Sequence, residues 1–179
     1  MKKIFILSSI YFFIMTSCFS LGAGVQGSVF PSFNTNENGI KYNGINASVT
    51  GTVRLLRIPV VFGFGMELGD NTKHFSFGAN GFADWWLIEH QIHNSWNFFM
   101  GLGISGRILT DSSWNWTTGA NLRIVTGMNY LIYDGYLELY AQNAIAPGFL
   151  KQFSSSTLSA SPATFNLIIP LEMGMRIHF

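Results

Sequence analysis

Apolar and polar residues alternate with a period of two along most of the chain, and the last segment shows the pattern most clearly. Between Phe165 and Phe179 every second residue is apolar, and most of the residues between them are polar or small. Successive side chains of a strand point to opposite faces, whereas a helix would scatter these apolar positions around its axis. The pattern therefore predicts a strand over residues 165–179 with one wholly apolar face.

The same alternation recurs upstream, with more noise in the first and fourth segments. The predicted strands span residues 21–30, 45–55, 60–68, 75–87, 97–108, 121–129, 137–142 and 165–179. Long connections are expected at 31–41, 69–74, 109–115 and 149–163, and short turns around Arg57, at 90–94 and around Asp134. Strict alternation of long and short connections is typical of an up-and-down barrel with both chain ends in the periplasm.

Eight charged residues fall inside these strands, and all of them lie on the polar face. They are Arg54, Glu67, Asp84, Arg107, Arg123, Glu138, Glu172 and Arg176. A lipid-facing Arg near the bilayer midplane costs about 2–4 kcal/mol, so the bias has a physical cause. Since buried charges are tolerated when paired, we predict a charge network in the lumen that joins these four acids to these four bases.

Composition separates a membrane barrel from a soluble sandwich, whose strands also alternate. Charged residues make up 11% of the chain, against about 25% in soluble domains. The predicted strands contain no Lys, and 10 basic residues against 9 acidic ones exclude a polybasic nucleic-acid binder. In lipid every backbone group needs an internal partner, which a closed barrel provides. We therefore predict an all-β fold, an eight-stranded antiparallel up-and-down transmembrane β-barrel.

The first twenty residues resemble a targeting segment. Lys2 and Lys3 precede an apolar run to Met15 and a tail of mostly small residues. This is typical of a cleaved signal peptide, since an uncleaved membrane anchor needs about 20 apolar residues. Cys18 is the only cysteine, which excludes an intrachain disulfide; its lipidation is the alternative to its loss with the leader. The predicted division is a signal peptide at 1–20 and an outer-membrane β-barrel at 21–179.

Aromatic residues cluster at the predicted strand ends, as in the girdles of membrane barrels. The girdle candidates are Trp85, Trp86, Trp96, Trp114, Trp116, Tyr130, Tyr133 and Tyr136. Trp114 and Trp116 offer an alternative, a stacking platform for a sugar or base. The chain ends in Phe179, which resembles the C-terminal signal that the barrel assembly machinery of bacterial outer membranes reads.

The chain resembles the small eight-stranded outer-membrane barrels of the OmpX, OmpA-transmembrane and OmpW kind, through its closing segment 165–179. Two further stretches, Asp84 to Gly103 and Leu122 to Tyr130, look like a poorly characterised spirochaetal barrel family. The resemblance implies export through the inner membrane and residence among outer-membrane lipid. It implies no periplasmic peptidoglycan-binding domain.

Candidate chemistry is sparse, and we predict neither an enzyme nor a cofactor or metal site. His74 and Ser76 have the His-x-Ser spacing of lipid A deacylases, but no acid is placed to orient the histidine. His90 and His93, near Glu89, are spaced for metal binding only on a helix, so a periplasmic turn is the preferred interpretation. His178 is expected to point inward as a polar cap.

Two functional hypotheses follow for the lumen. In the first, ion pairs plug the barrel, and its extracellular loops act in envelope structure or surface interaction. In the second, the barrel is a narrow channel for small or apolar solutes, as OmpW-like barrels are thought to be. Inward glycines favour the second by leaving volume: Gly63, Gly65, Gly101 and Gly103. A lipid A-modifying enzyme is the remote third alternative.

Overall fold

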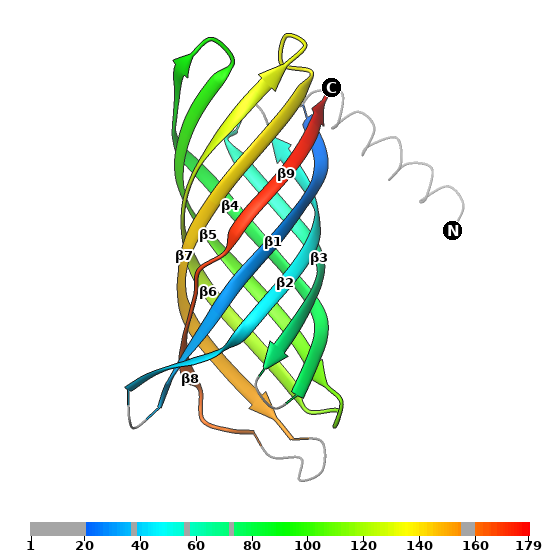
Figure 1. Ribbon diagram of the computed structural model, residues 1–179, viewed down its shortest axis with the longest axis vertical. Coiled ribbons are helices and arrows are strands. Elements are labelled where there is room, and N and C mark those ends of the chain that lie inside the picture. The colour runs from blue at the N-terminus through cyan, green and yellow to red at the C-terminus, as the bar shows by residue number, and fades with distance from the viewer. Residues whose placement is uncertain (1–20, 37–38, 56–57, 72–73, 155–159) are drawn as a thin grey trace, which may run out of the picture.

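The computed structural model describes residues 21–36, 39–55, 58–71, 74–154 and 160–179. The predicted signal peptide and Cys18 lie outside these residues. The strands are β1 (Leu21–Asn36), β2 (Gly39–Leu55), β3 (Val60–Asn71), β4 (His74–His93), β5 (Trp96–Asp111), β6 (Trp116–Ile132), β7 (Leu137–Phe153), β8 (Thr164–Ile168) and β9 (Leu171–His178). They wind around one barrel and are tilted relative to its axis (Figure 1).

The strands form a closed antiparallel ring. Each strand from β1 to β7 pairs with the next one along the chain, and both β8 and β9 lie between β7 and β1. β8 and β9 form one barrel strand interrupted at Ile169 and Pro170, where proline has no N–H to donate. The gap is bridged because the amide of Ala144 donates to the carbonyl of Pro170 at 3.0 Å. The predicted all-β, eight-stranded up-and-down barrel is confirmed.

The strands are longer than predicted, and the connections are shorter. β1 and β2 pair from Leu21↔Leu55 out to Asn36↔Gly39, so most of the expected loop 31–41 is a hairpin. The expected loop 109–115 shrinks to residues 112–115, and β4 extends to His93 through the expected turn. Only the connection 154–163 remains long, so the strict alternation of long and short connections was wrong.

Strand length explains this difference. The first seven strands have 12 to 20 residues, whereas a tilted strand crosses a bilayer with about 9–11. Pairing therefore continues into water, where the outward side chains become polar and the alternation fades. The short turn at Asp134 is confirmed, with positive φ at Tyr133, Asp134 and Gly135.

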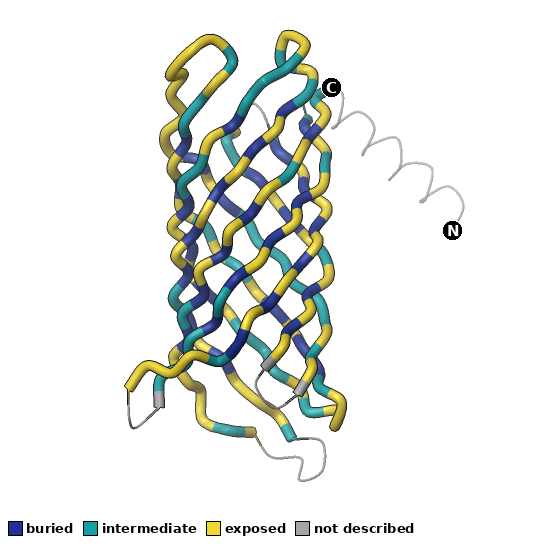
Figure 2. Tube along the Cα trace, viewed as in Figure 1, coloured by how far each residue is buried: buried dark blue, intermediate teal, exposed yellow. Residues whose placement is uncertain are grey.

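Buried and exposed residues alternate along the strands (Figure 2). The exposed positions are mostly apolar, and many of the buried positions are polar or charged. Phe64 and Met66 are 73% and 77% exposed, whereas Thr50 and Gln142 are almost fully buried. This inverts the arrangement of a soluble protein and is that of a barrel surrounded by lipid. No helix among the described residues is long and apolar enough to cross a membrane.

Gly65 lies at a close approach between β3 and β2. A Cβ added there would lie 2.0 Å from the carbonyl oxygen of Val49 on β2, a contact that backbone cannot relieve by rotation. Its diagonal neighbour on β2, Gly51, pairs with Phe64. A Cβ added at Gly51 would lie 3.8 Å from the nearest atom beyond its chain neighbours, the carbonyl oxygen of Phe64. Only one of these adjacent glycines is therefore required by packing.

We expect Gly65→Ala to destabilise the barrel by about 2 kcal/mol or more, because overpacking against fixed backbone forces the strands apart. The matched change Gly51→Ala should stabilise it by about 0.5–1 kcal/mol, since alanine loses less entropy on folding. Urea unfolding in lipid vesicles measures both. Equal effects of the two changes would contradict the close contact.

Candidate functional site: the filled lumen and its vestibule

The structure places all eight predicted lumen charges inside the barrel. Arg54 and Arg107 are the most exposed of them at 6%, and Glu138, Asp84 and Arg176 are at 0%. They come from β2 to β7 and β9, which the ring closure brings face to face. They form three groups along the barrel axis.

The barrel end with the connections 94–95 and 133–136 and the chain terminus Phe179 is called the short-turn end below. The first group lies near this end and centres on Glu138. Its Oε1 accepts from Arg54 Nη1 at 2.7 Å and from Asn129 Nδ2 at 2.7 Å. Its Oε2 accepts from Arg176 Nη1 at 3.2 Å and lies 3.0 Å from His178 Nε2. One carboxylate thus binds four side chains from three other strands and ties them together across the lumen.

The second group lies in the middle of the barrel. Arg123 binds Asp84 with two nitrogens, Nε to Oδ1 at 2.8 Å and Nη2 to Oδ2 at 3.1 Å. The same Nη2 lies 2.8 Å from Glu172 Oε2, which also accepts from Gln142. A bidentate arginine of this kind fixes both geometry and partner.

The third group lies toward the other end. Glu67 Oε1 accepts from Arg107 Nη1 at 3.0 Å and from Asn46 Nδ2 at 2.8 Å. Asn80 Nδ2 lies 3.5 Å from the second oxygen of Glu67. Each of the eight charges therefore has an oppositely charged partner.

Glu89 is a ninth lumen charge that the sequence pattern missed. Its Oε2 lies 2.6 Å from Arg54 Nη2, and its Oε1 accepts from Asn129. The register between β4 and β5 shifts between Trp86 and Ile88, so one extra residue reverses the faces beyond it. Glu89 was expected in a solvated turn beside two histidines; the bulge turns it inward.

An aromatic layer also fills the lumen. Trp86 stacks on Phe99 with ring centroids 3.7 Å apart and an interplanar angle of 8°. Both are buried, and they pack with Val61, Val125 and Ala144. The prediction of Trp86 as a girdle residue was wrong. Its position two residues after Asp84 on the same strand face was the signal for an inward side chain.

Cations lie against this layer. The guanidinium of Arg54 is 4.2 Å from the Trp86 ring centroid. That of Arg176 is 3.7 Å from the Tyr140 centroid and 5.6 Å from Trp86. These contacts offset part of the cost of burying arginine and join the first ion group to the aromatic layer.

The inward glycines leave little free volume, so the expectation that their volume favours a channel was wrong. A Cβ at Gly63 would lie 2.2 Å from the Phe82 ring, and one at Gly103 would lie 2.1 Å from Asp84 Oδ1. At Gly65 and Gly101 the backbone of a neighbouring strand comes equally close. Neighbours use the volume these glycines leave, and the middle of the lumen keeps a cavity of only about 30 Å³.

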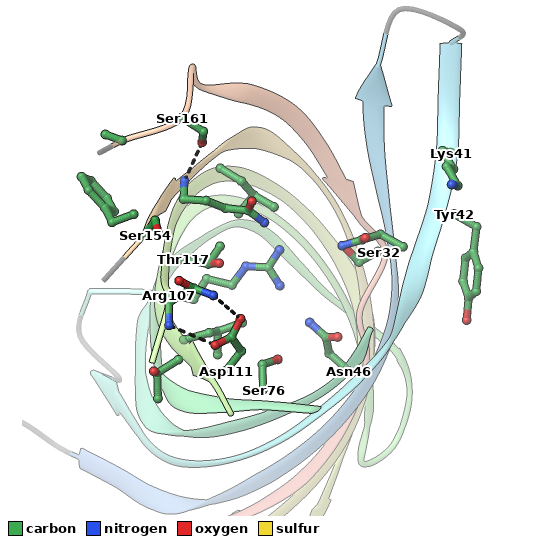
Figure 3. A pocket seen from close by; sticks show the side chains of 18 residues that line it. Ser32, Lys41, Tyr42, Asn46, Ser76, Arg107, Asp111, Thr117, Ser154 and Ser161 are labelled. Atoms are coloured by element: carbon green, nitrogen blue, oxygen red, sulfur yellow. Dashed lines mark hydrogen bonds between the residues drawn. The ribbon is translucent and has the colours of Figure 1, made fainter. Parts of the chain in front are cut away.

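A vestibule of about 660 Å³ (Figure 3) opens at the end of the barrel opposite the C-terminus, which is marked in Figure 1. Arg107 borders both the vestibule and the small inner cavity, so its ion pair with Glu67 forms the floor. Polar side chains form much of the wall. Those labelled in Figure 3 include Ser32, Asn46, Ser76, Asp111, Thr117 and Ser161.

Local hydrogen bonds hold the vestibule wall. Asp111 ends β5, and its Oδ1 accepts from the amides of Ser113 at 2.8 Å and Asn115 at 3.0 Å. This Asx-type turn explains why the connection to β6 needs so few residues. On β7, two strands away, the amide of Gln152 donates to Ser161 Oγ at 3.1 Å.

The remaining candidates give a mixed result. The other girdle candidates lie on the exterior or at its edges, and Trp96 packs on Tyr130 with centroids 4.8 Å apart. Ser76 Oγ donates to the carbonyl of Gly69 at 3.3 Å, and the side chain of His74 lies outside the described ones. His178 points inward to Glu138.

Within the described ranges, no three acidic, histidine or cysteine side chains form a metal-binding group.

A solved outer-membrane barrel has the same architecture. The crystal structure of Neisserial surface protein A (NspA) superposes with a TM-score of 0.50 at 15% identity, covering 88% of this chain and 97% of that one. This establishes the fold as the NspA type of barrel. The outer-membrane protease OmpT from Escherichia coli (TM-score 0.38, 7% identity, 90% and 96% covered) and a major outer membrane protein from Thermus thermophilus (0.39, 11%, 87% and 99%) also match.

No protein-family model and no curated protein sequence matches the chain. The resemblance to a spirochaetal family therefore stays a prediction.

Proposed function

We propose that the chain is an integral outer-membrane β-barrel protein with a plugged lumen, acting in envelope structure or surface interaction through its vestibule end. The observation that carries the proposal is the filled cross-section of the barrel. Trp86, Phe99 and Glu138 with its cations occupy the lumen at the short-turn end. Side chains held by buried ion pairs and stacked rings cannot move aside without leaving charges unpaired.

Outer-membrane residence is supported by two features. The NspA-type fold is that of a bacterial outer-membrane protein, and the exterior of this barrel is apolar. Export by a cleaved signal peptide follows from residues 1–20, which the structure does not describe. The amide of Phe179 donates to the carbonyl of Leu21 at 2.8 Å, so the proposed assembly signal lies where the first and last strands meet.

The vestibule is where an external molecule would meet the protein. In a barrel with its termini in the periplasm, the opposite end faces outward. The vestibule has the volume of a small-molecule pocket, about 300–1,000 Å³, and the ion pair between Arg107 and Glu67 lies at its inner end. Such a hollow can hold a ligand or a partner's side chains, and in a plugged barrel it does not continue into a channel.

The proposal predicts that the protein does not conduct ions across a membrane. Refolded protein that migrates differently in boiled and unboiled gel samples should give no unitary conductance steps in a planar bilayer. The matched variant Trp86→Ala/Phe99→Ala, which removes the stacked pair, should give more frequent current fluctuations than the parent. Defined steps from the parent chain would overturn the plug and favour the narrow channel instead.

A further inference from the structure

Two polar side chains interrupt the apolar exterior in the middle of the barrel. Thr126 on β6 and Asn143 on β7 face each other across the strand pair, with Thr126 Oγ1 2.6 Å from Asn143 Oδ1. Each lies six residues from the short-turn end of its strand. Their same-face neighbours two residues away are all apolar: Ile124, Met128, Ala141 and Ile145.

The amide nitrogen of Asn143 is left without a partner. The side chain of asparagine carries two N–H donors. Among the described residues, no group of this chain accepts a hydrogen bond from either of them. Asn143 is exposed, so in the bilayer its amide faces hydrocarbon. Acyl chains offer no acceptor, and an unsatisfied polar group there is costly. The sequence could place leucine here, as on the neighbouring strands, but does not.

A groove of about 690 Å³ lies beside this pair on the same face. Its lining includes the small residues Thr126, Ala141 and Asn143. Larger side chains border it: Trp96, Tyr130, Leu139, Leu171 and Met173. The face therefore combines a groove, small side chains at its centre and an amide N–H group without an acceptor.

We propose that this face is an interface between two copies of the chain, centred on Asn143. A carboxamide is self-complementary, so across a two-fold axis each Asn143 N–H donates to the other copy's Oδ1. The small side chain of Ala141 lets the two barrels approach, as small residues do between membrane helices. The inference is independent of whether the lumen conducts.

Cross-linking tests the proximity. In full-length protein carrying Cys18→Ser and expressed in a bacterial outer membrane, Ala141→Cys should give a disulfide-linked dimer with mild oxidant. The matched change Met66→Cys on β3, equally lipid-facing, should give none. Equal cross-linking at both positions, or none at Ala141→Cys, would overturn the interface. A cross-link to a different protein would overturn the second copy as the occupant.

A second measurement tests the hydrogen bond. In density-matched detergent, sedimentation equilibrium should show Asn143→Leu raising the dimer dissociation constant about tenfold, from two lost bonds. The same change should raise the urea midpoint of the monomer, because leucine suits lipid better than an unpaired amide. Met66→Leu should alter neither quantity. An unchanged dissociation constant for Asn143→Leu, or dimerisation abolished by lipid that co-purifies at the groove, would overturn the proposal.

Discussion

Replacing Glu138 with alanine is expected to destabilise the barrel by about 3–5 kcal/mol, the usual cost of leaving a buried charge without its partner. Glu138 is fully buried and binds both Arg54 and Arg176. Its removal leaves two guanidinium groups competing for Glu89 at the short-turn end of the lumen. Urea unfolding in lipid vesicles measures the change.

Glu89 is a matched control for Glu138. Its carboxylate contacts the same Arg54, at 2.6 Å, but its side chain is 31% exposed. Because water can replace a partly exposed partner, Glu89→Ala should cost about 1 kcal/mol or less. Comparable losses for the two changes would show that burial does not govern the energetics of this group.

A compensating variant separates charge from shape. Buried ion pairs are often replaced by hydrophobic residues of similar volume at little cost. Glu138→Leu combined with Arg54→Met and Arg176→Met should therefore be more stable than Glu138→Ala alone. If it were less stable, the hydrogen-bonded geometry of the group rather than charge neutralisation would hold this end of the barrel.

The fold and the face of each lumen charge could be predicted because lipid imposes a strict rule. Outward positions must be apolar, so period-two alternation carries the strand assignment and places Arg123 or Glu172 inward without any tertiary information. Partner choice could not be predicted in this way. Arg54 binds Glu138, 84 positions away, and such pairs depend on strand tilt and stagger around the closed ring.

The features that the pattern missed have specific causes. Inward positions accept any residue that finds a partner, so an aromatic residue type does not by itself reveal its face, and only the register with Asp84 marked Trp86 as inward. The bulge at Leu87 changed the face of Glu89 without a glycine or proline to mark it. Beyond the hydrocarbon the outward rule lapses, which is why the hairpin from β1 to β2 was expected to be a loop.

The aromatic layer should contribute as much to stability as the ion group. Trp86→Ala is expected to destabilise the barrel by about 3–5 kcal/mol, because it leaves a large cavity in a packed interior. The ring of Trp86 is 1% exposed and contacts Phe99 on one face, with Arg54 nearby. Urea unfolding in vesicles again provides the measurement, with Trp86→Phe as the conservative control at under about 1.5 kcal/mol.

A double-mutant cycle distinguishes stacking from simple volume. Trp86→Ala, Phe99→Ala and the double variant should give a coupling energy of about 0.5–1.5 kcal/mol, as expected for a stacked aromatic pair. Strict additivity of the two losses would mean that the rings fill space independently. Coupling would mean that they act as one layer, whose position beside Arg54 and Arg176 joins lumen closure to barrel stability. A natural variant that opened this lumen would then have to replace the pair and the adjacent ion group together.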